Sequence, residues 1–157
     1  AKNEAEMTCA FLVRKNIAKA VLTKDTDALA CLTPIMLSSV NISKKMFTMI
    51  DLNTILNELN MSKESWVDFC IMCGTDFNEN LPQIGPLKSL ALIQEYKSLE
   101  AVEKAKPDLD MTPLRYKETR QLFKMDETLD HLDDLQWKKV DLDQLKRYAQ
   151  QFNLSIW

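Results

Sequence analysis

Two aspartates follow directly after a short apolar run near the start of the chain. Residues 20–22 predict a buried strand, and Asp25 and Asp27 come just after it. In an extended segment, side chains two residues apart point the same way, so both carboxylates can face one point. Strand ends in open α/β sheets border the crevice in which ligands bind. The pair therefore indicates a site for a hard divalent cation.

A plainer interpretation of the same two residues stays open. Asp25 or Asp27 would then only cap a helix formed by residues 28–32. A calcium loop of the EF-hand type does not fit, because Leu29 and Ala30 stand where a third ligand and a glycine are needed.

Further carboxylates stand at the boundaries of other predicted elements. Glu4 and Glu6 lie at the start of a predicted helix, and Asp76 lies in a loop between two more. Carboxylates that converge without a cation disfavour one another's ionisation, and Mg²⁺ or Mn²⁺ would relieve this repulsion. Glu6 can instead close a capping box with Asn3, which would give it only a structural role.

The composition excludes several kinds of chemistry. His131 is the only histidine in the 157 residues, so histidine-based catalysis is not expected, and the two glycines are too few for a glycine-rich phosphate loop. Cys70 and Cys73 lie on a predicted helix without a second cysteine pair, which favours core residues in a reducing compartment. The net charge of −3 argues against a general polyanion-binding surface, and no apolar run could span a bilayer.

The order of the predicted elements places the chain in the α/β class. Short apolar runs at residues 20–22, 35–37 and 46–50 predict strands, and helices and turns separate them. We therefore expect part of a mostly parallel sheet with flanking helices.

From residue 52 onward the pattern is helical. Ser62 is expected to cap a helix whose apolar residues repeat at helical spacing and which ends at Gly74. After a loop, Gly85 and Pro86 have the order expected just before and at the first position of a helix.

The last third of the chain adds further predicted helices. Ser98 caps a short one, and Thr112 with the proline after it opens one that runs to about Lys124. After an acidic linker at residues 126–134, Asp141 caps a final helix. The residues of this helix expected to face inward are Leu142, Leu145, Ala149 and Phe152.

Taken in order, four short segments resemble the family of flap endonucleases and XPG-type 5′ nucleases. They are Asn-Glu-Ala-Glu at residues 3–6, Thr-Lys-Asp-Thr-Asp at 23–27, Cys-Gly-Thr-Asp-Phe at 73–77 and Gln-Ile-Gly-Pro at 83–86. The segment at residues 135–138 resembles the family as well. Each segment alone is a weak signal, but their order and spacing agree over nearly the whole chain.

The resemblance implies the identity of the metal ligands. They would be Glu4, Glu6, Asp25, Asp27 and Asp76, holding two Mg²⁺ or Mn²⁺ ions. The implied chemistry is hydrolysis of DNA phosphodiesters, in which one ion helps to generate the attacking hydroxide and the other stabilises the leaving oxygen. Such a mechanism needs no nucleophilic side chain.

The resemblance also implies a helix–two-turn–helix that binds duplex DNA, at residues 62–104. The helix N-terminus that begins at Gly85 and Pro86 would present free backbone N–H groups to a phosphate, with the charge of Lys88 one turn further on. An ordinary helical hairpin that packs on the sheet is the alternative. The loop carbonyls implied for a monovalent cation, K⁺, are those of Asn80, Pro82 and Ile84.

By the same resemblance, residues 1–61 form the C-terminal half of the α/β nuclease core, and residues 105–157 form a helical segment that packs back on it. The family's N-terminal half has no counterpart in this sequence, so we expect that half as a partner and little cleavage by this chain alone. The implied substrate is double-stranded DNA with a 5′ flap, branch or end, in replication or repair. The implied location is intracellular and nuclear, away from membranes.

Two other functions stay open at this stage. The chain could be a non-catalytic module that binds duplex DNA, from a split or degenerate member of the family. It could also be a helical interaction domain whose acids only cap helices and lie in solvated turns.

Overall fold

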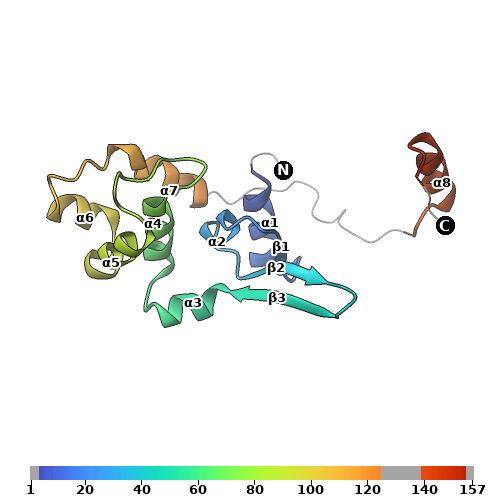
Figure 1. Cartoon of the computed structure of the whole chain (residues 1–157), viewed down its shortest axis with the longest axis horizontal. Helices are drawn as coiled ribbons and strands as arrows, with labels where there is room; N and C mark the ends of the chain where they lie inside the picture. The colour runs from blue at the N-terminus through green and yellow to red at the C-terminus, as the bar shows by residue number, and fades with distance from the viewer. Residues whose placement is uncertain (1–3, 125–138, 155–157) are drawn as a thin grey trace. The chain divides into compact units, whose positions relative to one another are not determined.

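The computed structural model describes residues 4–124 and 139–154 of the 157. The chain divides into one unit that ends at Glu127 and a second from Thr128 onward, and each is described by itself. The first unit holds the sheet and helices α1 to α7, and the second holds helix α8 (Figure 1). The helices of the described residues are all too short or too polar to cross a membrane. Asn3, His131 and the predicted segments at residues 126–134 and 135–138 lie outside the described residues.

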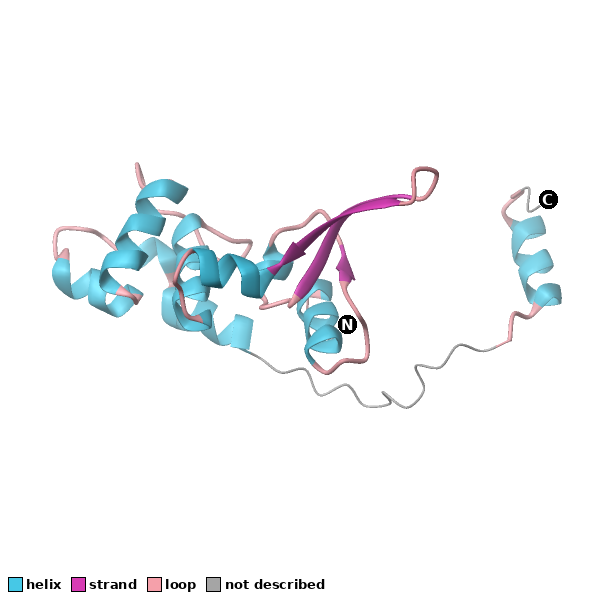
Figure 2. Cartoon of the chain, turned by 90° about the horizontal axis from the view of Figure 1, so that it is seen from below, coloured by secondary structure: helices cyan, strands magenta, loops and turns pink. Residues whose placement is uncertain are grey.

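The sheet has three strands, β1 (Val21–Leu22), β2 (Ile35–Asn41) and β3 (Met46–Asp51), in that order. Strand β1 pairs with β2 in parallel, and β2 pairs with β3 antiparallel. The expectation of a mostly parallel sheet is therefore wrong for the described residues. The chain passes from β2 to β3 through residues 42–45 alone, and so short a connection can join only antiparallel strands. Figure 2 shows these two strands as one long hairpin.

The two faces of the sheet differ in exposure because successive side chains of a strand point to opposite faces. Val21 of β1 and Met36 of β2 are partners across the parallel pair, and both are buried. Leu22, one residue after Val21, is exposed, as are Phe47 and Met49 of β3. The buried face is the one on which the helices of the core pack.

Three helices supply most of the core on the buried face. They are α1 (Ala5–Arg14), α2 (Asp27–Ala30) and α3 (Leu52–Glu58). The core residues shared between these helices, the strands and the following helix are Val13, Val21, Ala28, Leu29, Met36, Leu52, Leu56 and Trp66.

Trp66 ties this core to the next helix, α4 (Lys63–Cys73). Its indole N–H donates to the carbonyl of Leu29 in α2 at 3.0 Å, and the ring is buried. Helix α2 begins at Asp27, so this contact fixes the helix that carries Asp27 against α4.

Two serines begin helices where the sequence predicts them. The Ser62 hydroxyl accepts the Ser65 N–H at 3.1 Å at the start of α4. The Ser98 hydroxyl accepts the Ala101 N–H at 3.3 Å at the start of α6 (Leu99–Ala105). Side-chain oxygens of this kind satisfy backbone donors that a helix leaves free in its first turn.

The two glycines also mark helix ends as predicted. Gly85 is the N-cap of α5 (Pro86–Tyr96), which has its proline in the first turn. Gly74 ends α4 with a φ of +92°, and a Cβ there would lie 3.2 Å from the Cβ of Asn80. Both the dihedral angle and the close approach favour glycine at this position.

The helix predicted to start at Thr112 is split in two. A 3₁₀ turn (Thr112–Leu114) is followed by α7 (Tyr116–Lys124), and Arg115 between them has a left-handed φ of +43°. Leu114 and Tyr116 are 0% and 5% exposed. Residues two apart on one continuous helix do not share a face, so the break lets both side chains reach the core.

A network of ion pairs fixes α7 against α4 and α6. Arg120 donates to both carboxylate oxygens of Asp68, at 2.8 and 2.9 Å, and to both of Glu100, at 2.6 and 3.0 Å. Asp68 is 2% exposed and also accepts the Leu99 N–H at 3.0 Å. Burial raises the pKa of Asp68, and the Leu99 N–H and Arg120 oppose that shift.

Helix α8 (Leu142–Gln151) is the described part of the second unit. Asp141 caps it as predicted, accepting the Gln144 N–H at 2.9 Å. Of the four side chains expected to face inward, Ala149 is buried within this unit, and Leu142, Leu145 and Phe152 are exposed in it, so their packing against the core stays a prediction. A single helix cannot bury an apolar stripe on itself, because that stripe needs a second element to cover it.

Candidate metal centre

Helix α1 brings the first two carboxylates to its N-terminus. Glu4 is the N-cap residue and Glu6 lies in the first turn. The N-cap thus falls one residue later than a capping box between Asn3 and Glu6 requires, and among the described residues no side chain makes a capping bond to this helix. The partial positive charge at a helix N-terminus favours carboxylates at both positions.

The second pair of carboxylates lies in a tight turn between β1 and α2. The Asp25 N–H donates to the Thr23 hydroxyl at 3.0 Å, and the Asp27 N–H donates to the Asp25 carboxylate at 2.9 Å. Asp25 thus closes a turn just before α2, but the N-cap of this helix is Thr26 and no side-chain bond caps it, so neither aspartate is the cap that the plainer interpretation predicts. A carboxylate has about four acceptor sites, so this single bond leaves Asp25 able to bind a cation.

Asp76 reaches the same region from the loop after α4. Its backbone N–H points to the carboxylate of Asp27, with 3.5 Å between the nitrogen and Oδ2. These residues are 49 positions apart in the chain, and the Trp66 contact described above holds their two elements together.

The predicted carboxylates converge. A small pocket is lined by Glu4, Glu6, Asp25, Asp27 and Asp76, together with Met7, Cys31 and Phe77. The free space in this pocket is about 10 Å³, close to what one water molecule needs. The structure thus brings all five acids from three separate segments to one place.

The pKa of Asp27 reports the crowding of negative charge. Burial is the largest cause that raises it, and the charges of Asp25, Asp76 and Glu6 raise it further. The hydrogen bond from the Asp76 N–H lowers it in part. A cation in the pocket would oppose each of the charge effects, because it favours ionised carboxylates.

Asparagine in place of Asp27 should stabilise the metal-free chain at pH 7. Because the pKa of Asp27 is raised, ionising this carboxyl takes more free energy in the folded than in the unfolded state. The ionised side chain therefore destabilises the fold, and this destabilisation develops as the pH rises from the unfolded-state to the folded-state pKa. We expect Asp27→Asn to unfold at a higher temperature than the parent in EDTA at pH 7. The difference should vanish once the pH falls below the pKa of an unfolded aspartate. A lower unfolding temperature for the variant at pH 7 would contradict this.

The donor set fits magnesium or manganese. All five acids offer hard oxygen ligands, which these ions prefer. Burial raises the pKa of the Cys31 thiol, which also lines the pocket, to about 12, so this thiol is protonated at pH 7 in the metal-free chain. Among the described residues, no three His, Cys, Asp or Glu side chains stand close enough to hold one ion. Mg²⁺ commonly binds through one or two carboxylates and keeps several waters, so it does not need such a group.

The residues predicted to bind DNA and a monovalent cation lie apart from the lining of this pocket. Gly85 and Pro86 form the N-terminus of α5, as predicted. The ammonium of Lys88 donates to the carbonyl of Gln83 at 3.0 Å, so it lies against the loop that holds the predicted cation ligands. In this loop the Ile84 N–H donates to the Leu81 carbonyl at 3.1 Å. The loop residues named as cation ligands are Asn80, Pro82 and Ile84.

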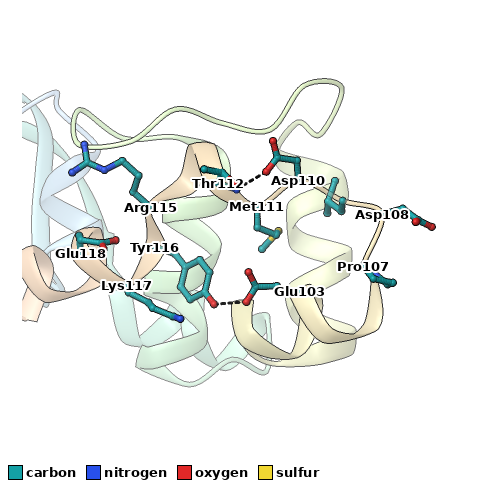
Figure 3. A pocket seen from close by; sticks show the side chains of 11 residues that line it. Glu103, Pro107, Asp108, Asp110, Met111, Thr112, Arg115, Tyr116, Lys117 and Glu118 are labelled. Carbon is teal, nitrogen blue, oxygen red and sulfur yellow. Dashed lines mark hydrogen bonds between the residues drawn. The ribbon is translucent and has the colours of Figure 1, made fainter.

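A larger cavity, of about 500 Å³, lies around the start of α7 and holds none of the five acids. Figure 3 shows hydrogen bonds between residues that line it: the Tyr116 hydroxyl donates to Glu103 at 2.7 Å, and the Thr112 backbone N–H donates to Asp110 at 3.0 Å. Burial, helped by Glu103, raises the pKa of Tyr116 to about 12. These bonds are structural, and we assign no chemistry to this cavity.

Sequence reasoning missed the residues that hold the Asp76 loop in place. Asn78 and Thr75 bond to each other across Asp76, and the ring of Phe77 packs edge-on against Phe123 of α7 with 5.6 Å between centroids. A threonine three residues before an asparagine is a turn signal that the sequence does contain. Nothing local links Phe77 to Phe123, which are 46 residues apart.

Comparisons with known proteins point to one family. The XPG I-region matches residues 1–76, the range that contains all five acids. Flap endonuclease 1 of Tetrahymena thermophila is 34% identical over 157 residues, covering 92% of this chain and 41% of the relative. Flap endonuclease 1 of Ovis aries is 34% identical over 155 residues, with 94% and 41% covered. The solved structure of flap endonuclease-1 from Methanococcus jannaschii has a TM-score of 0.77 at 23% identity, covering 95% of this chain and 45% of that one.

The fold is that of the nuclease core seen in flap endonucleases. The chain belongs to the XPG-type 5′ nuclease family. It spans about 41% of the length of the curated relatives that it matches.

Proposed function

We propose that this chain is part of a structure-specific 5′ nuclease that hydrolyses DNA phosphodiesters with two divalent metal ions. The observation that carries the proposal is the pocket in which five carboxylates from three segments meet. The name flap endonuclease, which the curated relatives carry, agrees with it, as do solved structures of Rad2 with DNA substrate and of human GEN1 with Holliday junction DNA.

Each segment has its own part in the proposed chemistry. Glu4 and Glu6 present carboxylates at the mouth of α1, where the helix dipole supports their charge. Asp25, Asp27 and Asp76 face them across the pocket as the remaining ligands. Two Mg²⁺ or Mn²⁺ ions, when bound, would supply an activated water and stabilise the leaving oxygen. A structure of the junction-resolving enzyme GEN1 with product DNA and Mg²⁺ supports the choice of metal.

The DNA-binding part of the proposal rests on α4 and α5. We assign residues 62–104 as a helix–two-turn–helix that holds duplex DNA without reading its sequence. Helix α5 begins at Gly85 and Pro86, and the backbone N–H groups of Gly85 and of the residues after Pro86 would bind a phosphate, with Lys88 adding a positive charge beside them. The loop carbonyls beside Lys88 are the proposed site of K⁺.

Lys88→Ala should weaken binding to duplex DNA and reduce its salt dependence. A lysine that contacts one phosphate releases about one counterion, so the slope of log K against log salt should fall by about one. Fluorescence anisotropy at several KCl concentrations measures this slope. Lys44→Ala, which removes a lysine from the turn between β2 and β3, is the control and should leave the slope unchanged.

The remaining parts of the proposal concern the whole protein. Residues 1–61 would be the C-terminal half of the nuclease core, and residues 105–157 would pack back on it. The N-terminal half that the curated relatives have would complete the site as a partner. The proposed substrate is double-stranded DNA with a 5′ flap, branch or end, and the proposed setting is replication or repair in the nucleus.

A second candidate function is a duplex-binding module without catalysis. The observation that favours it is the narrow acidic pocket, with room for about one water and no group of three close ligands among the described residues. A cleavage assay with 5′-flap DNA and Mg²⁺ separates the two functions. The chain alone should cut little or nothing, and the chain joined to the N-terminal half of a curated relative should cut. Binding without cleavage in the joined protein would favour the second candidate.

A further inference from the structure

Asp76 lies in a loop that closes on itself. The Thr75 N–H donates to the Asn78 carbonyl at 3.3 Å, and the Asn78 N–H donates to the Thr75 carbonyl at 3.2 Å. These two backbone bonds hold the residues on either side of Asp76 and Phe77. The direction of the Asp76 side chain therefore depends on how firmly this loop is held.

The side chain of Asn78 holds the loop at both of its ends. Its oxygen accepts the Thr75 hydroxyl at 2.7 Å. Its nitrogen donates to the carbonyls of Ile71, at 2.8 Å, and Glu79, at 3.0 Å. Ile71 lies in the last turn of α4 and is 0% exposed, so this bond anchors the loop to a fixed part of the core.

We infer that Asn78 is a positioning residue for Asp76 and sets the affinity of the pocket for a divalent cation. This inference rests on the proposed metal centre. Without the Asn78 amide, the Ile71 carbonyl loses its anchor to the loop and Thr75 loses its acceptor. The Asp76 loop can then adopt more conformations, and in fewer of them does the Asp76 side chain lie near Asp27. Replacing a group that orients a metal ligand typically lowers metal affinity tenfold to a hundredfold.

The test is a Mn²⁺ titration of the 157-residue chain, followed by the EPR signal of free Mn²⁺. We expect Asn78→Ala to bind Mn²⁺ about tenfold more weakly than the parent. Asn53→Ala is the matched control, because it removes an exposed asparagine from α3, away from the pocket. Far-UV circular dichroism and urea unfolding of each variant show whether it is folded.

A double variant distinguishes positioning from a merely structural role. If Asn78 acts through Asp76, then Asn78→Ala should cause no further loss of Mn²⁺ affinity once Asp76→Asn is present. Thr75→Val keeps the side-chain shape but removes the hydroxyl that donates to Asn78 and accepts the Phe77 N–H, so it loosens the same loop. Thr75→Val should also weaken Mn²⁺ binding. It replaces Asn78→Ala in the test if Asn78→Ala does not fold.

Failure of this inference and failure of the proposed metal centre look different. Parent-like Mn²⁺ affinity in folded Asn78→Ala or Thr75→Val, with weaker binding by Asp76→Asn, would overturn the role of Asn78 alone. The role of Asn78 would also be overturned if Asn78→Ala lowered the Mn²⁺ affinity by the same factor with and without Asp76→Asn. Parent-like affinity in both Asp76→Asn and Asp27→Asn, or no Mn²⁺ binding by the parent chain, would overturn the metal centre itself.

Discussion

Asp27→Asn should reduce cleavage of 5′-flap DNA by at least about a thousandfold, in a protein that joins this chain to the N-terminal half of a curated relative. Metal ions contribute several kcal/mol to charge stabilisation in such reactions, and each 1.4 kcal/mol is about tenfold in rate. Asp27 lies among the other acids, since the charges of Asp25, Asp76 and Glu6 all act on it. DNA binding should change little, because the proposed phosphate contacts lie on α5.

Glu79→Gln is the control for this loss of cleavage. Glu79 belongs to the same loop as Asp76 and carries the same charge, but it is not part of the lining of the acidic pocket. Single-turnover cleavage and equilibrium DNA binding should be measured on both variants. Equal losses of cleavage and binding in Asp27→Asn would show a structural role for Asp27. Equal losses of cleavage in the two variants would show a general effect of charge.

Arg120→Ala should destabilise the fold by about 3–5 kcal/mol, the typical cost of leaving a buried charge without its partner. Asp68 is 2% exposed, and Arg120 is the cation bonded to both of its carboxylate oxygens. The same variant removes the contact between α7 and Glu100 of α6, while the Tyr116–Glu103 bond between these helices remains. Urea unfolding, monitored by tryptophan fluorescence, measures the change in free energy.

Lys117→Ala is the control on the same helix. Lys117 is exposed and lies over the ring of Tyr116 at 5.7 Å, a contact worth about 0.5–1 kcal/mol at an exposed site. We expect the Lys117 variant to stay within that range. A loss of less than about 1 kcal/mol for Arg120→Ala would mean that the buried carboxylate is satisfied by the Leu99 N–H and solvent alone.

Helix ends were predictable from the sequence because their causes are local. Ser62, Ser98 and Asp141 each accept a backbone N–H three residues ahead, which a sequence displays directly. Gly85 before a proline works in the same way at the start of α5. Each of these helices begins where the sequence predicts.

Features that depend on distant residues could not be predicted. The apolar run at residues 35–37 indicates a strand, but pairing with β3 extends β2 to Asn41 and leaves only residues 42–45 to connect the two antiparallel strands. The left-handed Arg115 arises because Leu114 and Tyr116 must both reach the core. Arg120 meets Asp68 across 52 positions of chain, and no local pattern marks either residue.

The candidate site was predictable only in part. Asp25 and Asp27 follow a predicted strand, and their residue type and spacing alone mark them as candidate cation ligands. Their meeting with Asp76 follows from the packing of α2 on α4 through Trp66, which no local pattern shows. The family resemblance supplied that link in the sequence, and the structure shows the shared pocket.

The central claim is that the acidic pocket holds divalent cations. The most direct test is anomalous diffraction from crystals of the chain soaked in Mn²⁺. We predict Mn²⁺ peaks within bonding distance of the carboxylates of Asp27 and Asp76. Peaks only at other carboxylates, with none between those two, would contradict the claim.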